Sequence, residues 1–154
     1  MVENVRTLLG KIVLLELALS ANVACPDIFV EVYLNGTKLF ESAAQKQVQT
    51  ITYNIDESPA DHALQLVMRG KNFSHTQFND AEEIVKDIYF QVDRLEFENI
   101  DMREIFCLGK SCYAHNFNST DPVFLDEFYG IIGCNGTVSI EFSTPIYLWF
   151  NNHF

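Results

Sequence analysis

The chain has 154 residues, of which 48% are hydrophobic and 20% are charged, so it is long and apolar enough to bury a core. That composition excludes a disordered tail. Twenty-one acidic residues against 10 basic ones give a formal net charge of −11. Such a charge would repel a phosphate backbone, so nucleic acid is not an expected partner.

The apolar segment before Cys25 has two competing interpretations. A lipoprotein signal needs an unbroken apolar centre, but Lys11 and Glu16 interrupt the run, and Asn22 stands where an aliphatic residue is needed. No run is long and apolar enough to span a bilayer, so no membrane span is expected. The favoured interpretation is a first strand whose inward side chains alternate along the chain: Val13, Leu15, Leu17 and Leu19.

Alternating apolar residues predict two more strands before residue 60. The first covers residues 28–34, and its inward side chains are Ile28, Val30, Val32 and Leu34. Asn35-Gly36 is typical of a type I′ hairpin turn, because both central residues of that turn need a positive φ. Residues 47–55 alternate again and place three side chains together: Ile51, Tyr53 and Ile55.

The stretch from His62 to Phe97 carries two strand patterns joined by a polar loop. The first pattern alternates at Leu64, Leu66 and Met68. In the second pattern Ile88, Phe90 and Val92 share one face, whereas Leu95 and Phe97 have the opposite parity. One extra residue flips all later side chains, so this switch predicts a β-bulge near Asp93-Arg94.

The last third of the chain continues with short strand patterns. Residues 99–106 and 111–117 are expected to be strands, while residues 124–133 fit either a strand or a short helix. Residues 137–142 alternate cleanly, and residues 144–150 are expected to form the last strand. About nine or ten short strands with hardly any helical pattern predict an all-β, jelly-roll-type antiparallel β-sandwich. We expect one domain over residues 1–154.

The loop between residues 70 and 87 is the first candidate for a binding site. Calcium takes carboxylate and carbonyl oxygens as ligands. The loop gathers carboxylates within eight positions: Asp80, Glu82, Glu83 and Asp87. It lacks the residue order of an EF-hand, and a solvated acidic loop without metal is the competing interpretation. Calcium is the one cofactor that the sequence suggests.

Aromatic residues near this loop suggest a sugar ligand. Exposed rings can stack on pyranose rings, and the candidates are Phe73, Phe78 and Tyr89. The plainer interpretation places most rings of this chain in the core, because it contains 13 Phe and 6 Tyr.

Catalytic motifs are missing from the sequence, which has no G-x-S-x-G, H-E-x-x-H or phosphate-binding glycine loop. We therefore predict that the protein is not an enzyme. Structural roles are expected for His62, His115 and His153. The cysteines are expected to be small buried thiols, and a metal site on Cys107, Cys112 and His115 is the alternative.

The C-terminal segment suggests an interface. Aromatic residues dominate buried contact patches between proteins, and the candidate anchors are Tyr147, Trp149 and Phe154. A last sandwich strand is the plain alternative, and both can hold together.

Residues 28–100 resemble the calcium-dependent xylan-binding family of carbohydrate modules. The hairpin, the H-x-L strand, the F-x-N-D segment and the D-R-N-L-Y-V-D strand of that family have counterparts at residues 32–36, 62–64, 78–80 and 87–93. Ile88-Tyr89 replaces the Arg-Asn pair of the last motif. The resemblance implies a jelly-roll fold and, as an alternative function, calcium-dependent carbohydrate binding.

The chain is also similar, over nearly its whole length, to small proteins of marine contractile-tailed cyanophages. The similarity lies in residues 11–36, in residues 68–71 and above all in residues 127–150. It implies a place in a phage virion that assembles in the bacterial cytoplasm. We therefore expect a non-enzymatic virion accessory protein, such as a fibre, tail or capsid-decorating component. Its partners would be other virion proteins, copies of itself or a host-surface glycan, and a small glycoside hydrolase is the less favoured alternative.

Overall fold

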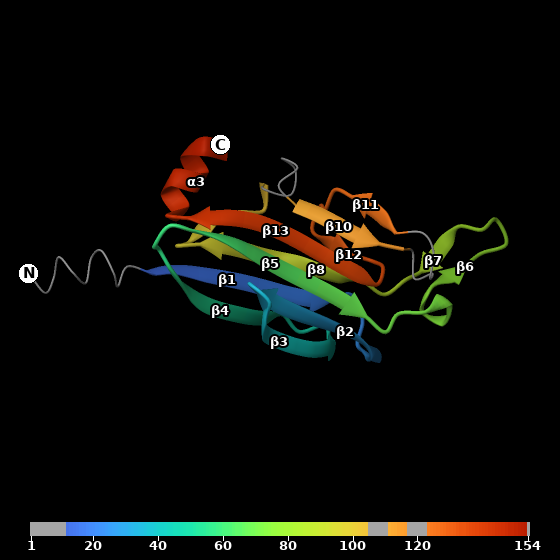
Figure 1. Ribbon diagram of the computed structural model, residues 1–154. Helices are drawn as coiled ribbons and strands as arrows, with labels where there is room; N and C mark the ends of the chain where they lie inside the picture. Colours follow the sequence, from blue (N-terminus) through green and yellow to red (C-terminus); the bar gives the residue numbers. More distant parts are fainter. Residues whose placement is uncertain (1–11, 105–110, 117–122, 154) are drawn as a thin grey trace, which may run out of the picture.

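Two antiparallel β-sheets pack face to face in the computed structural model, which describes residues 12–104, 111–116 and 123–153 (Figure 1). In the five-stranded sheet the order is β12 (Ile131–Ile132), β8 (Phe90–Phe97), β1 (Ile12–Ala21) and β4 (Gln49–Asp56), and β9 (Ile100–Asp101) pairs with β8. In the six-stranded sheet the order is β11 (Phe124–Asp126), β10 (Ser111–His115), β13 (Gly136–Thr144), β5 (Ala60–Arg69), β2 (Cys25–Leu34) and β3 (Thr37–Ala44). The predicted jelly-roll-type β-sandwich is confirmed.

Two small features stand at opposite ends of the sandwich (Figure 1). One end carries a projecting hairpin of β6 (Gln77–Phe78) and β7 (Ile84–Lys86), which follows the short 3₁₀ helix η1 (Phe73–His75). At the other end lies the helix α3 (Ile146–His153). In the described part of the chain, none of the helices has the length and apolar character needed to cross a membrane.

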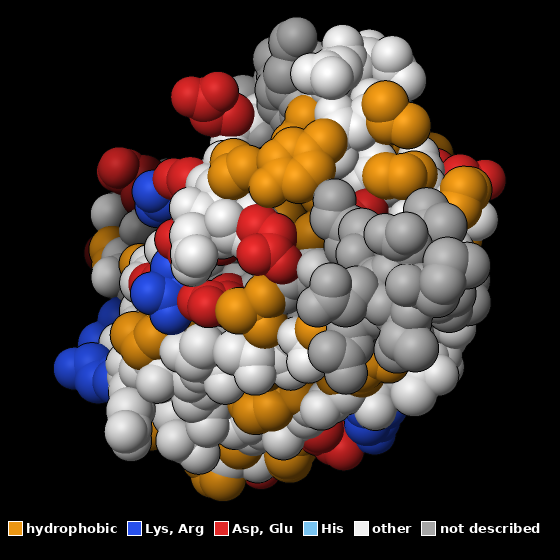
Figure 2. All heavy atoms as spheres, turned by 90° about the vertical axis from the view of Figure 1, so that its left-hand side faces the viewer, with side chains coloured by type: hydrophobic (Ala, Val, Ile, Leu, Met, Phe, Trp, Pro, Cys, Tyr) orange, Lys and Arg blue, Asp and Glu red, His pale blue; other side chains and the backbone are white. Residues whose placement is uncertain are grey.

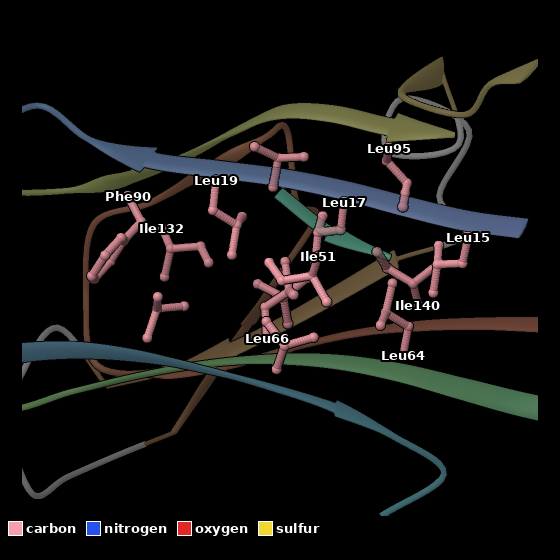
Figure 3. Packing of buried hydrophobic residues seen from close by; sticks show 14 of the residues in the cluster. Leu15, Leu17, Leu19, Ile51, Leu64, Leu66, Phe90, Leu95, Ile132 and Ile140 are labelled. Atoms are coloured by element: carbon pink, nitrogen blue, oxygen red, sulfur yellow. The ribbon is translucent and has the colours of Figure 1, made fainter. Parts of the chain in front are cut away.

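The core consists of alternate side chains from both sheets, which point toward one another between the layers (Figure 3). Leu15, Leu17 and Leu19 of β1 face Leu64 and Leu66 of β5, and all are at most 2% exposed. Burying a leucine side chain contributes about 1.5–3 kcal/mol. The predicted inward faces of β1, β2 and β5 are therefore confirmed.

The two sharpest local predictions are also confirmed. Asn35 and Gly36 have φ of 51° and 83° and connect β2 to β3 as a tight hairpin. The register of β8 against β1 shifts between Arg94 and Val92, which leaves Asp93 as the extra residue of a bulge. The switch in hydrophobic parity thus marks the position of the bulge.

One local expectation was wrong, and the structure specifies two others more closely. Residues 144–150 were expected to form a strand, but α3 begins at Ile146, because Ile146 and Trp149 pack into the core at helical spacing. Residues 124–133 contain two short strands, β11 and β12, with no helix between them. Tyr53 shares the parity of Ile51 and Ile55 but is 43% exposed, because β4 lies at the edge of its sheet.

Candidate functional site

The predicted acidic loop forms the projecting hairpin, and its tip is open to solvent. Asp80, Glu82 and Glu83 are exposed. The side-chain oxygen of Asn79 accepts hydrogen bonds from the backbone N–H groups of Ala81 and Glu83, both at 2.9 Å. The amide of Asn79 therefore shapes this turn, and the carboxylates point into water.

Asp87 has a different role, at the base of the hairpin. The ammonium of Lys71, whose side chain is 1% exposed, lies 2.5 Å from Asp87 Oδ1. It also donates to the carbonyl oxygens of Ile88, at 2.8 Å, and Gly133, at 2.5 Å. Lys71 thus places its positive charge among one carboxylate oxygen and two carbonyl oxygens, the kind of ligands that a hard cation such as calcium binds. Calcium binding by Asp80, Glu82, Glu83 and Asp87 stays a prediction, in which Lys71 would compete with the ion for Asp87.

The three aromatic residues predicted to bind a sugar differ in their exposure to solvent. Phe73 and Phe78 are 72% and 55% exposed, as a stacking role requires. Tyr89 is half-buried, and its backbone N–H donates to Asn22 Oδ1 at 2.9 Å. Sugar stacking on these three rings also stays a prediction.

The predicted C-terminal anchors lie on α3 or beyond it. Tyr147 is 49% exposed, whereas Trp149 is 5% exposed and packs into the core. Phe154 lies outside the described residues. Of the two anchors that the structure describes, Tyr147 is the more exposed.

A hollow of about 660 Å³ lies beside α3, and we call it the α3 hollow. Its wall consists of Asn35, Asp61, His62, Ala63, Glu141, Phe142, Ser143, Trp149 and His153. These residues come from the β2–β3 turn, the start of β5, the end of β13 and α3. Figure 2 views this end of the molecule, where hydrophobic side chains gather near the top with acidic ones beside and below them.

Strand register places the acidic side chains of the hollow. In the pairing of β5 with β13, Asp61 is opposite Ser143 and Ala63 is opposite Glu141. Residues two apart on a strand point to the same face, so both carboxylates lie on the outer face of the sheet as diagonal neighbours. Both residues are exposed, so the hollow offers hydrogen-bond acceptors and a negative potential.

A chain of hydrogen bonds fixes the floor of the hollow. Asn35 Oδ1 accepts the N–H of Ala63 at 2.9 Å, so its amide nitrogen donates to His62 Nδ1 at 2.9 Å. His62 Nε2 then donates to Thr144 Oγ1 at 3.0 Å, and Thr144 donates to the carbonyl of Ser58 at 2.6 Å. This sequence of donors needs a neutral imidazole. Burial lowers the pKa of His62, which favours that state.

Aromatic rings line the side of the hollow next to α3. The rings of Trp149 and His153 stack with their centroids 4.9 Å apart, and His153 Nδ1 bonds the carbonyl of Trp149 at 2.8 Å. On the opposite side, His62 stacks on Phe142 at 5.1 Å. Trp149 and Phe142 are at most 5% exposed, so the ring surface open to the hollow belongs mainly to His153 and His62. It lies beside carboxylates, an amide and a hydroxyl.

Two observations bear on catalysis. His115 Nε2 lies 2.5 Å from Asp126 Oδ2, and the nearby hydroxyl of Tyr113 is held by both backbone groups of Cys134. Burial raises the pKa of the Cys134 thiol, so at neutral pH it is a protonated thiol and a poor nucleophile. In the part of the chain that the structure describes, this cluster thus lacks an activated nucleophile.

The cysteines differ in burial. Cys25 is buried as expected, but Cys112 is exposed, so the expectation of buried thiols was wrong for it. Cys134 is intermediate. Cys107 lies outside the described residues, and with it the alternative metal site on Cys107, Cys112 and His115.

Sequence reasoning missed the α3 hollow. The sequence placed His62 at the start of a strand pattern and Glu141 within the alternating residues 137–142, and it assigned neither to a binding site. The residues come from segments about 80 positions apart, brought together by the β5–β13 register. A pattern along one segment carries no signal for such a site.

No protein family matches this chain, and no curated protein is similar to it in sequence. One solved structure is similar in fold, the carbohydrate-binding module vCBM60 in complex with galactobiose. The identity is 10%, the TM-score is 0.45, and the alignment covers 82% of this chain and 96% of that one.

Proposed function

We propose that this chain is a non-enzymatic carbohydrate-binding module that holds a neutral oligosaccharide in the α3 hollow. The observation that carries the proposal is the make-up of this hollow, in which exposed carboxylates lie beside stacked aromatic rings in a recess of ligand size. Sugars present hydroxyl groups at their edges and apolar C–H groups on their faces. Both kinds of surface find partners here.

The contacts follow from the positions of the side chains. Asp61 and Glu141 accept hydrogen bonds from sugar hydroxyls, and Ser143 between them can donate or accept. An anionic sugar is disfavoured, because both carboxylates are negative and the whole chain has a net charge of −11. The ligand class is therefore a neutral, hydroxyl-rich oligosaccharide.

Hydrolysis is the competing function for the same hollow. Asp61 and Glu141 are diagonal neighbours, a spacing at which two carboxylates can act on a glycosidic bond. A general acid, however, needs apolar surroundings that keep it protonated. Both residues are exposed to water, which favours binding without bond cleavage.

The test is a glycan array followed by titration calorimetry with the best ligand. Asp61→Asn with Glu141→Gln should weaken binding at least about tenfold, since hydrogen bonds to charged groups contribute about 1.5–3 kcal/mol. The matched control is Glu127→Gln, an exposed carboxylate outside the wall of the hollow, which should bind like the wild type. Absence of glycan binding in the wild type, or equal affinity in the double variant, refutes the proposal. Release of reducing sugar would identify a hydrolase instead, and a chelator arm tests the predicted calcium.

A second proposal is that the chain is an accessory component of a phage virion. It is favoured by the projecting hairpin and the 3₁₀ helix η1 before it, which carry four large apolar side chains that are 55–72% exposed: Phe73, Phe78, Ile84 and Val85. Such exposure on one small element is typical of a protein contact, with capsid or tail proteins or with copies of this chain. Mass spectrometry of purified virions tests it. Absence of the chain from the particles, or unchanged incorporation of Phe78→Ser with Ile84→Ser, would contradict it.

A further inference from the structure

Three metal-binding side chains converge at the end of the sandwich that carries the hairpin. The ligand atoms of Cys25, Asp27 and His75 all lie within 4.8 Å of one another. Among residues 12–104, 111–116 and 123–153, no other three Cys, His, Asp or Glu side chains converge this closely. The carboxylates at the hairpin tip do not do so either.

The fold builds this cluster from two segments far apart in sequence. Cys25 and Asp27 are two positions apart at the start of β2, so their side chains share one side of the strand. Gly70, with φ +92°, lets the chain pass so close to β2 that a Cβ there would lie 2.1 Å from the Asp27 carbonyl oxygen. This close passage brings the 3₁₀ helix η1, and with it His75, to the start of β2.

The position of His75 is fixed by a capping box. Asn72 Oδ1 accepts the N–H of Ser74 at 2.9 Å, and the N–H of Asn72 donates to His75 Nδ1 at 3.0 Å. A metal ion needs a free lone pair on the imidazole. In neutral His75 the free lone pair is on Nδ1, which accepts the N–H of Asn72. Metal binding therefore replaces this exposed hydrogen bond.

We propose that Cys25, Asp27 and His75 form a binding site for a divalent transition-metal ion, with Zn²⁺ as the best fit. Thiolate and imidazole are the ligands that zinc prefers, and a carboxylate completes a three-ligand set with one position open to water. Calcium and magnesium are disfavoured, because they need oxygen ligands. The thiolate and the carboxylate together balance the charge of the ion, and one proton leaves the Cys25 thiol as the metal binds.

The separations suit tetrahedral coordination after a small movement. With bonds of about 2.3 Å to sulfur and about 2.0 Å to nitrogen or oxygen, tetrahedral ligands lie roughly 3.3–3.6 Å apart. The atoms here lie within 4.8 Å, so closing the site needs about 1 Å of movement. Asp27 is exposed and His75 is half-buried, so the exposed side can move, whereas the buried Cys25 stays fixed in the core.

The experiment is titration of the full chain with Co²⁺ and Zn²⁺ under reducing conditions. Co²⁺ bound to a thiolate gives a charge-transfer absorption that carboxylates alone do not give, so it separates this site from adventitious binding to an acidic surface. We expect one ion per chain, and Zn²⁺ should displace Co²⁺ and abolish the band.

Variants decide which residues hold the ion. His75→Gln changes the last residue of η1, outside the core, and should fold normally, yet weaken Zn²⁺ binding at least about tenfold. Cys25→Ser should remove the cobalt–thiolate band. Cys112→Ser, which alters an exposed cysteine elsewhere, is the matched control and should leave both readouts unchanged. Absence of the band in the wild type, or a band and affinity unchanged in His75→Gln, overturns the proposal. The glycan-binding proposal is unaffected by either result.

Discussion

The buried ammonium of Lys71 gives the sharpest stability prediction. Lys71→Met keeps most of the length of the side chain but removes three hydrogen bonds, to Asp87, Ile88 and Gly133. Breaking a buried ion pair by removing one partner costs about 3–5 kcal/mol, because the other charge is left without compensation. The Asp87 side chain is 27% exposed and still accepts from Thr76 and the N–H of Ile88, so the lower end applies, about 3 kcal/mol.

Urea unfolding followed by the fluorescence of Trp149 measures this loss, since Trp149 is the one tryptophan of the chain and is buried. With a slope of about 2 kcal/mol per molar urea, the midpoint should fall by about 1.5 M. The matched control is Lys38→Met, a lysine that is 43% exposed in surface ion pairs, for which less than about 1 kcal/mol is expected.

A double variant tests the cause. Lys71→Met with Asp87→Asn should lose less stability than the sum of the single changes, because the uncompensated carboxylate is gone. Equal midpoint shifts for the Lys71 and Lys38 variants would refute the reasoning, since a buried and an exposed lysine would then contribute alike.

Three further changes can be measured in the same assay. A hydrogen bond from Tyr33, helped by cationic neighbours, lowers the pKa of Glu31 from 4.5 to about 2, so its stabilisation is complete above pH 4.5 and is lost as the pH falls toward 2. Glu31→Gln should lower the free energy of unfolding by about 1–2 kcal/mol at pH 7 and leave it unchanged near pH 2. The loss is smaller than the full pKa shift implies, because the partners of Glu31 are partly solvated. Burial lowers the pKa of His62 from 6.5, so stability is complete above that pH and declines below it, and His62→Gln should make the decline shallower. Gly70→Ala would place a Cβ 2.1 Å from the Asp27 carbonyl oxygen and should cost about 2–3 kcal/mol.

Controls separate these causes. Gly36→Ala has a similar φ of +83° but nothing within 4 Å of the new Cβ, so it should cost only about 1 kcal/mol. Equal losses at Gly36 and Gly70 would mean that the contact with Asp27 is unimportant. If the stability of Glu31→Gln falls with decreasing pH in the same way as that of the wild type, Glu31 is not the source of this pH dependence.

The sequence was most informative where a signal lies within one segment. The parity switch around Asp93 and the positive φ needed at Asn35 are local, and both predictions were right. The wrong strand at the C-terminus arose because an apolar, aromatic run fits either structure. The spacing of Ile146 and Trp149 was the available helical signal, and it was overlooked.

Long-range polar contacts could not be predicted in this way. Lys71 follows a glycine in what reads as a solvated loop, yet its acceptors lie 16 to 62 positions away and bury it. The α3 hollow depends in the same way on which residues β5 and β13 place opposite each other. Such contacts are set by the folded sheets and have no counterpart in periodicity.

The attachment of the β6–β7 hairpin has a practical consequence. The contacts that hold the segment 71–87 to the sandwich lie at its two ends, at Lys71 and Asp87. The turn at residues 79–83 forms its hydrogen bonds mainly within itself. The segment between those anchors is therefore a natural grafting position. A foreign epitope exchanged for the turn would be displayed at the far tip of a rigid scaffold, with the strand registers behind it undisturbed.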